Sequence, residues 1–366
     1  MKNQKKLVLS IILIVVLVFQ ASTCFAADIK DTLIYQKWLI KGGTSGFLGN
    51  PISDTTITPN GLGIYNHFQG GSIYRKNTFS DAFEVHGMIR DKWAQLGWET
   101  SFLGFPVSDE TDTYNQGGRY NDFEGGSIFY KWGAPSAYEV HGMIRDKWAQ
   151  LGWETSFLGY PVSDETDTYN QGGRYNDFEG GSIFYKWGAP SAHEIHGDIR
   201  GLWSWLGWES CALGYPTTDE YSVNGKQASH FDNGAIYWTP TSGAWPMMSG
   251  PCYTTSPFVS QQLSVSYEPL QFFGTYISVS GRGFNPNKDI SVYISDLWGP
   301  YQIASVRTNS NGEFSYNSRN YAQYIGNTYI DKVNGYITVF ARENGYGPAA
   351  IYSSACYGVG FDVTLD

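Results

Sequence analysis

The stretch that decides the fold is HGMIRDKWAQLGWETSFLGFP, residues 86–106, which recurs at residues 141–161 with one change, Phe105 to Tyr160. The repetition extends further, because residues 86–140 match residues 141–195 at all but three positions. A fixed period of this length indicates a repeat architecture, in which each unit buries its apolar face against its neighbours. A Leu-Gly-x-Pro motif marks four copies at a spacing of 55 residues: Leu48, Gly49 and Pro51; Leu103, Gly104 and Pro106; Leu158, Gly159 and Pro161; Leu213, Gly214 and Pro216.

Each copy is predicted to open with a short helix. Ile89, Trp93 and Leu96 lie on one face at helical spacing, and Gly97 supplies the residue that ends the helix. We therefore expect Trp93 to be a core-facing anchor. Its equivalents in the next two copies are Trp148 and Trp203.

An Asp follows each Leu-Gly-x-Pro motif. A carboxylate at this place is expected to close an Asx turn or to cap local amides. Acid/base catalysis is the alternative, but glycoside hydrolysis needs two unlike carboxyls that face one bond. One carboxylate per unit therefore favours a structural role. The four residues are Asp54, Asp109, Asp164 and Asp219.

Each copy ends in a predicted hairpin. Aromatic and β-branched runs flank Glu124-Gly125-Gly126, which is a strong turn signal, and a third strand over 137–141 leads into the next helix. The fold class is therefore mainly β, with four repeats of about 55 residues. We predict these repeats at 28–85, 86–140, 141–195 and 196–246.

The rest of the chain is predicted to hold three further segments. Residues 1–26 resemble a secretory signal peptide, with a retained membrane anchor or a lipidated Cys24 as alternatives. Residues 247–257 are rich in Pro, Gly, Ser and Thr and predict a linker. Residues 258–366 alternate as short strands and predict an immunoglobulin-like β-sandwich, in which Cys252 and Cys356 are the pair we expect to be bridged. Cys211 stands where the sister repeats carry Ser.

The motifs are similar to those of the LGFP repeat family. The resemblance rests on Leu-Gly-[Phe/Tyr]-Pro, the following Asp-Glu, Phe-x-x-Gly-[Ser/Ala]-Ile and the closing [Val/Ile]-His-Gly-x-Ile. It implies an array of propeller-like units that form a pseudo-symmetric ring, and a module of exported cell-envelope proteins that binds wall polysaccharide. The first copy departs from the pattern, since it carries Asn50 for the aromatic residue and lacks an equivalent of Trp98.

Neither composition nor motifs favour catalysis or nucleic-acid binding. A net charge of −10 is a poor match for phosphates. No Walker loop, dinucleotide fingerprint, His-Glu-x-x-His or Gly-x-Ser-x-Gly is present in the sequence, so we expect no enzyme, no cofactor and no metal. His86, His141 and His196 also recur at this period. A shared metal is the alternative to our interpretation that a neighbouring backbone group satisfies each imidazole.

The aromatic side chains are the best functional candidates. Trp98, Trp153 and Trp208 follow the helix stop among polar neighbours and are expected to be more exposed than Trp93. Flat rings stack on sugar rings while nearby polar groups bind hydroxyls. Packing between repeats is the alternative role for these Trp. Second candidates on the hairpins are Tyr130, Trp132, Tyr185, Trp187 and Trp238.

The sequence therefore predicts a secreted or cell-wall-associated, non-catalytic protein. Its predicted partner is cell-wall polysaccharide or peptidoglycan, bound at several equal aromatic sites. A structural or adhesive surface protein whose C-terminal sandwich binds a protein partner is the main alternative. A cell-wall hydrolase is a third.

Overall fold

The computed structural model describes residues 27–211, 213–248, 262–270, 274–296, 299–317, 336–343 and 351–358. The predicted signal peptide, Cys24, most of the linker and the Cys252 partner of the predicted disulfide lie outside these residues. No helix within the described ranges is both long and apolar enough to cross a membrane.

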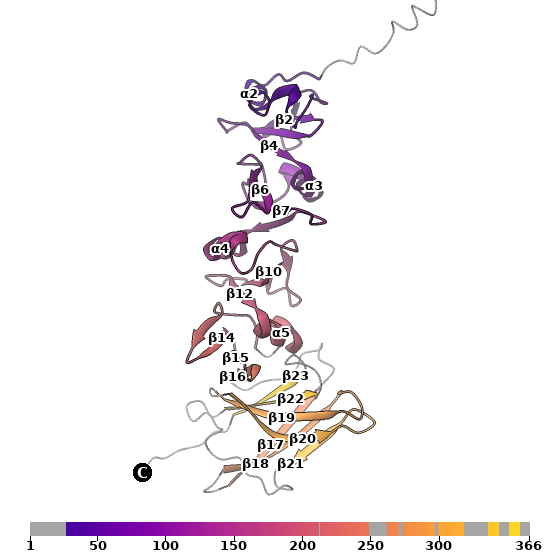
Figure 1. Ribbon diagram of the computed structural model, residues 1–366, viewed down its shortest axis with the longest axis vertical. Helices are drawn as coiled ribbons and strands as arrows, with labels where there is room; N and C mark the ends of the chain where they lie inside the picture. Colours follow the sequence, from indigo (N-terminus) through magenta and orange to yellow (C-terminus); the bar gives the residue numbers. More distant parts are fainter. Residues whose placement is uncertain are drawn as a thin grey trace, which may run out of the picture. The chain divides into compact units, whose positions relative to one another are not determined.

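Each repeat contains one α-helix, one 3-10 turn and one four-stranded antiparallel sheet (Figure 1). The α-helices are α2 (Thr32–Ile40), α3 (Gly87–Leu96), α4 (Gly142–Leu151) and α5 (Gly197–Leu206). The 3-10 turns are η1 (Gly43–Ser45), η2 (Trp98–Thr100), η3 (Trp153–Thr155) and η4 (Trp208–Ser210). The predicted helix, hairpin and third strand are thus confirmed.

The strands of each sheet follow one another in sequence order, so every sheet is a meander. The first sheet holds β1 (Thr56–Ile57), β2 (Gly63–Phe68), β3 (Gly71–Lys76) and β4 (Phe83–His86). The second holds β5 (Thr111–Asp112), β6 (Gly118–Phe123), β7 (Gly126–Lys131) and β8 (Tyr138–His141). The third holds β9 (Thr166–Asp167), β10 (Gly173–Phe178), β11 (Gly181–Lys186) and β12 (His193–His196). The fourth holds β13 (Tyr221–Val223), β14 (Lys226–Phe231), β15 (Gly234–Thr239) and β16 (Gly243–Met248). The opening strand of each sheet was not predicted, because two or three residues are too few to show alternation.

The chain divides into two compact units that do not follow the repeat boundaries. Among the described residues, one unit comprises 27–112, 119–130 and 134–137, and the other comprises 113–118, 131–133 and those from 138 onward. Closure of the four repeats into a ring, which depends on how these units sit, stays a prediction.

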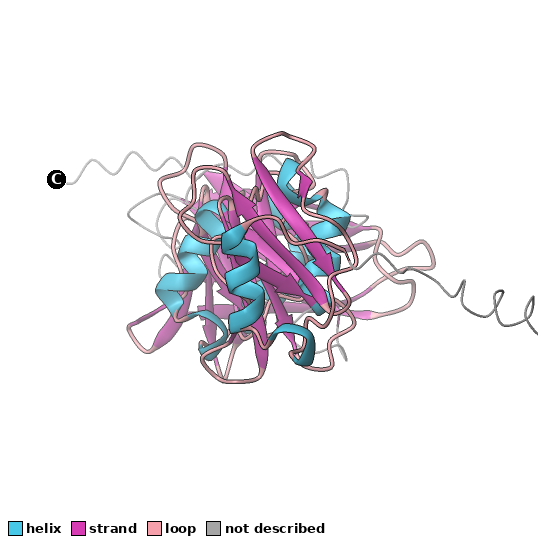
Figure 2. Ribbon diagram, turned by 90° about the horizontal axis from the view of Figure 1, so that it is seen from above, coloured by secondary structure: helices cyan, strands magenta, loops and turns pink. Residues whose placement is uncertain are grey.

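Each helix anchors the core of its repeat through one Trp. Trp93, Trp148 and Trp203 are fully buried, as predicted. Around Trp203 the core gathers Ile199 from the same helix, Leu213 from the motif and Trp245 from β16. The helices and the short hairpins around them are shown in Figure 2.

The aromatic residue of each Leu-Gly-[Phe/Tyr]-Pro motif packs on the preceding repeat. Tyr215 lies so close to Gly173 of β10 that a Cβ on this glycine would meet the Tyr215 ring at 2.9 Å. The Tyr215 hydroxyl lies 2.7 Å from the Thr168 hydroxyl, also in the preceding repeat. Tyr215 is buried, and so is its equivalent Phe105. The motif is therefore a joint between neighbouring repeats as well as a turn.

Two glycines give a matched test of packing inside the repeats. A Cβ on Gly180, in the β10–β11 turn, would lie 2.1 Å from the carbonyl oxygen of Phe157, whereas one on Gly201, inside α5, would meet no atom within 4 Å. Gly180→Ala is expected to lower the free energy of unfolding by about 1–3 kcal/mol. Gly201→Ala is expected to raise it by about 0.5–1 kcal/mol, because glycine is a poor helix former. Denaturant titration checks both, and a destabilised Gly201→Ala would show that α5 tolerates no side chain there.

The C-terminal strands form two antiparallel sheets. The first pairs β17 (Gln262–Leu270), β18 (Gly274–Arg282) and β21 (Phe314–Asn317). The second follows the order β20-β19-β22-β23, with β19 at Asp289–Asp296, β20 at Gly299–Arg307, β22 at Tyr336–Glu343 and β23 at Ile351–Gly358. The strands predicted from alternation are confirmed, while an immunoglobulin-like sandwich remains a prediction.

Candidate functional site

Trp208 is held at the edge of the fourth repeat's core by an unusual backbone. Gly207 ends α5 at φ 104°, and Trp208 itself has φ 55°, a left-handed value that a non-glycine residue rarely adopts. The indole lies edge-on to Trp203 at 5.3 Å between ring centroids. Trp208 is half-buried whereas Trp203 is fully buried, so the predicted difference in exposure is confirmed.

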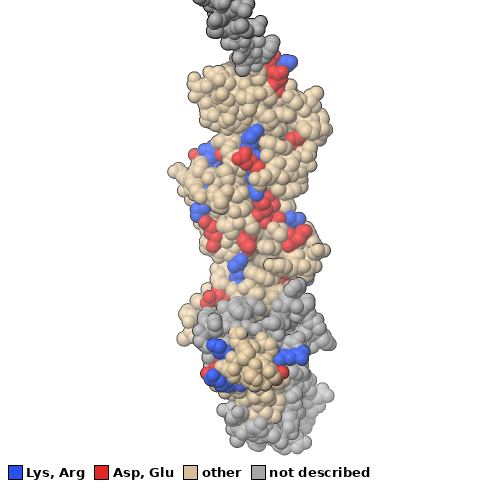
Figure 3. Space-filling model, turned by 90° about the vertical axis from the view of Figure 1, so that its right-hand side faces the viewer, with Lys and Arg blue, Asp and Glu red and all other residues tan. Residues whose placement is uncertain are grey.

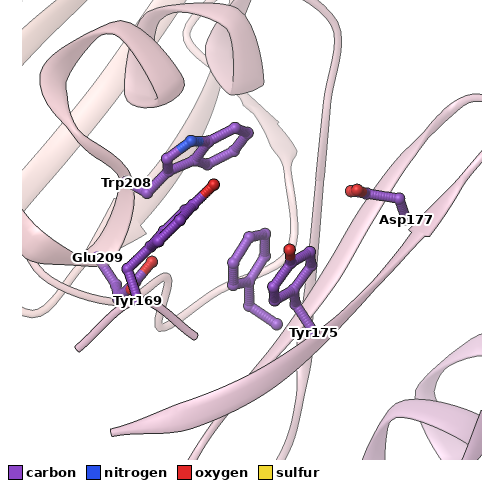
Figure 4. A pocket seen from close by; sticks show the side chains of 6 residues that line it. Tyr169, Tyr175, Asp177, Trp208 and Glu209 are labelled. Atoms are coloured by element: carbon purple, nitrogen blue, oxygen red, sulfur yellow. The ribbon is translucent and has the colours of Figure 1, made fainter. Parts of the chain in front are cut away.

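A pocket of about 80 Å³ opens beside Trp208 (Figure 4). One wall is the third repeat's sheet with its β9–β10 loop, and the other is η4 of the fourth repeat. In Figure 4 the Tyr169 ring lies next to the Trp208 indole, and Asp177 lies at the far side of the pocket from Tyr169. The space suits a few water molecules or a small ligand group. Its lining residues are Tyr169, Tyr175, Asp177, Phe184, Trp208 and Glu209.

The rings of this pocket are stacked in a fixed order. Tyr175 stacks on Phe184 at 5.2 Å between centroids, and Phe184 stacks on Trp208 at 5.8 Å. The Arg200 guanidinium lies 5.2 Å from the centre of the Trp208 ring, which is cation–π geometry. Tyr169 is 69% exposed and is thus the wall most open to solvent.

Glu209 brings a nearly buried carboxyl to the pocket. The residue is only 4% exposed, and one carboxyl oxygen accepts a hydrogen bond from the Asn170 amide at 3.1 Å. The other oxygen accepts none from any residue that the structure describes. A buried carboxyl oxygen without a donor is costly, so this oxygen marks an unsatisfied acceptor beside the pocket.

A similar arrangement recurs in the first unit. Tyr65 stacks on Tyr74 at 5.0 Å, Tyr74 stacks on Trp98 at 6.2 Å, and Glu99 is buried with an oxygen that no described residue bonds. Burial raises the pKa of the Glu99 carboxyl. His67 stands in the place of Asp177, and burial together with the Arg90 charge lowers its pKa to about 4. In the sequence, the remaining copy carries Tyr114, Tyr120, Asp122, Phe129, Trp153 and Glu154 at the six positions.

The second set of predicted aromatic residues lies elsewhere. Trp132 and Trp187 are each 52% exposed, and neither lines the pocket. Trp238 is half-buried and donates to Asp198 at 2.6 Å. Tyr130 is half-buried, as is Tyr185, whose ring lies 5.6 Å from that of Trp187.

The repeated Asp residues do not cap local amides, so that prediction is wrong. Asp109 accepts a hydrogen bond at 3.0 Å from the backbone amide of Glu84, which lies 25 residues earlier, and pairs with Lys37 at 3.0 Å. Asp219 does the same with the Glu194 amide and with Lys147, and its pKa falls to about 2, because hydrogen bonds and the Lys147 charge outweigh burial. These carboxylates are therefore joints between repeats.

The repeated His residues are satisfied by carboxylates rather than by backbone groups, which corrects our interpretation. His86 Nδ1 lies 2.8 Å from Glu84 and 3.2 Å from Glu110. His141 lies at the same distances from Glu139 and Glu165. Within the described residues no three His, Cys, Asp or Glu side chains are grouped to hold a metal.

Cys211 lies beside the fourth core as a free thiol. Burial raises the pKa of this thiol to about 12, so the nucleophilic thiolate form is not populated near neutral pH. Its environment fits the prediction of a small structural residue.

Glu165 should make stability depend on pH. Burial, with the nearby Glu139 charge, raises the pKa of Glu165 to about 7 against the opposing charges of His141 and Arg174. The folded chain then holds a proton that the unfolded chain has released, so the free energy of unfolding should fall as the pH rises from about 4.5 to about 7. Glu165→Gln should flatten this fall when unfolding is measured across that range. Identical pH profiles for the two proteins would contradict the linkage.

The fold and the pocket define a repeat protein with aromatic sites formed where one repeat meets the next. The model of the LGFP repeat family matches residues 48–101, 103–156, 158–210 and 213–255. These matches cover more than half of the chain, so the chain belongs to the LGFP repeat family. No curated protein matches the chain.

Solved structures resemble the chain only faintly. The extracellular domain of a one-component system from B. thetaiotaomicron has a TM-score of 0.17 and 9% identity, over 82% of this chain and 43% of that one. PorZ, a surface component of the type-IX secretion system of Porphyromonas gingivalis, has a TM-score of 0.15 and 15% identity. The match covers 85% of this chain and 39% of PorZ. A hemopexin fold protein from cow pea has a TM-score of 0.15 and 10% identity, and the match covers 50% of this chain and 88% of that protein. The chain spans less than half of the first two structures, and TM-scores this low do not establish a shared fold.

Proposed function

We propose that this LGFP repeat protein is exported to the cell surface and binds cell-wall polysaccharide without catalysis. The observation that carries the proposal is the pocket at Trp208, which stacked aromatic rings and the Glu209 carboxyl line together. Aromatic faces bury the apolar side of a sugar at low entropic cost, and a carboxyl oxygen accepts from its hydroxyl or amino groups. A site of this kind suits a saccharide.

The repetition of the site supports binding rather than catalysis. Near-identical units offer equal weak sites, and a polymer that engages several of them gains affinity through effective concentration. The repeated Asp and His residues, which could suggest acid/base chemistry, are committed to structural bonds between and within repeats. We therefore assign the repeats to attachment.

On one face of the repeats, charge favours neither a polyanion nor a polycation (Figure 3). On the face shown in Figure 3, basic and acidic side chains lie interspersed over the repeats. Several of them form ion pairs, such as Lys186 with Asp232 at 2.9 Å and Arg119 with Glu110 at 2.7 Å. Recognition is thus expected to rest on local sites rather than on a long-range field.

Retention of the full chain on isolated bacterial cell walls tests the proposal. The full chain should sediment with walls and with insoluble wall glycan, and remain soluble without them. Washing at high salt should leave most of it bound, because stacking is not screened. A chain that stays in the supernatant with every wall preparation would refute a wall-binding function.

A further inference from the structure

We propose that the pocket at Trp208 receives the ammonium group of an amino sugar whose amine is free. The inference rests on the proposed function and specifies its ligand. The geometry consists of a ring cage of Tyr169, Tyr175, Phe184 and Trp208 closed by the Glu209 carboxyl. An aromatic cage that has a carboxyl group at its floor is suited to organic cations.

The Glu209 carboxyl supplies the group that distinguishes an ammonium from a neutral substituent. Glu209 is 4% exposed, and one of its carboxyl oxygens accepts a hydrogen bond from the Asn170 backbone amide at 3.1 Å. Glu209 lines the pocket, and its second carboxyl oxygen is buried and receives no hydrogen bond from the described residues. An ammonium donates up to three hydrogen bonds, and a charge-assisted bond to a carboxylate is about twice as strong as a neutral one.

The other charges around the pocket are already compensated. Arg200 pairs with Asp177 at 3.0 Å, and the Ser182 hydroxyl donates to the same Asp177 oxygen at 2.5 Å. Arg200 also lies over Trp208 at 5.2 Å from the ring centre. The carboxyl of Glu209 is therefore the group in this pocket whose charge no described residue neutralises, and a ligand cation would complete it.

The repetition of the unsatisfied carboxyl supports a function for it. Glu99 and Glu154 are 5% and 4% exposed, and each has one carboxyl oxygen without a hydrogen bond from described residues. Glu154 uses its other oxygen to accept from the Asn115 amide at 3.2 Å, as Glu209 does from Asn170. The same orphan oxygen in three repeats shows that these three carboxyls share one environment.

The test uses two hexasaccharides of equal length, one of glucosamine and one of N-acetylglucosamine. Titration calorimetry with the full chain at about pH 6, where an alkyl amine is protonated, measures both affinities. The wild type should bind the glucosamine hexamer about tenfold or more tightly than the acetylated one. The Glu99→Gln, Glu154→Gln and Glu209→Gln triple variant should lose that preference, because Gln turns a donor toward the ligand while its oxygen keeps the backbone bond.

A second triple variant controls for overall charge. Asp91→Asn, Asp146→Asn and Asp167→Asn remove the same charge at exposed positions that do not line the pocket, and this protein should keep the preference. Equal loss in both variants, or a Gln variant that keeps the preference with an unchanged melting temperature, would overturn the inference. Equal affinity for the two hexamers together with retention on walls would overturn it too, while leaving the proposed function intact. Failure to be retained on walls would instead refute the proposed function.

Discussion

Replacing Trp98, Trp153 and Trp208 together by Ala should lower the apparent affinity for wall polysaccharide about a hundredfold or more. Each substitution removes one aromatic ring that we propose to contact the glycan, which weakens binding by that repeat by roughly 1 kcal/mol or more. Losses at several linked sites multiply, because avidity depends on all of them. Sedimentation with increasing amounts of wall glycan measures the change, and single variants should show only small effects.

The controls for this triple variant are Trp132→Ala and Trp187→Ala. Both indoles are 52% exposed, and neither lines the pocket at Trp208. A protein with both changes should bind like the wild type. If it loses retention while the first triple variant keeps it, the hairpin Trp residues are the binding surface and the pocket is a packing feature.

Of the single substitutions considered in the repeats, Trp203→Ala should lower the free energy of unfolding most. The indole is fully buried and contacts Phe184 at 4.6 Å, Trp208 at 5.3 Å and Phe231 at 5.4 Å between ring centroids. Removing a buried Trp costs about 3–5 kcal/mol through lost burial and the cavity that remains. Denaturant or thermal unfolding of the full chain should show this loss.

An exposed Trp provides the comparison for that cost. Trp187→Ala should change the free energy of unfolding by no more than about 0.5 kcal/mol, as surface substitutions usually do. A similar small effect for Trp203→Ala would mean that the helix of the fourth repeat does not anchor its core. The same assay on Trp208→Ala shows how far this half-buried residue contributes to packing.

Most of the repeat's internal structure could be predicted because period and local pattern agree. Trp93 at helical spacing, the glycine stop at Gly97 and the turn at Glu124-Gly125-Gly126 each report on residues close in the chain. These local rules gave the helix, the hairpin and the buried Trp correctly. The greater exposure of Trp98 than of Trp93 could also be predicted, because the residues that flank Trp98 are polar.

Contacts between neighbouring repeats could not be predicted in the same way. Asp109 reaches the Glu84 amide, and Tyr215 reaches Thr168, across one repeat boundary. A period states that equivalent residues share a role, but it does not state which repeat supplies their partners. The left-handed backbone of Trp208 and the unsatisfied oxygen of Glu209 are likewise products of that packing.

The indole N–H signals of the full chain, labelled with nitrogen-15 at Trp, test the central claim most directly. Each signal is assigned by one Trp→Phe variant, and soluble wall glycan is then titrated into the sample. The account predicts that the signals of Trp98, Trp153 and Trp208 shift with glycan. Shifts confined to Trp132, Trp187 and Trp238 would contradict it.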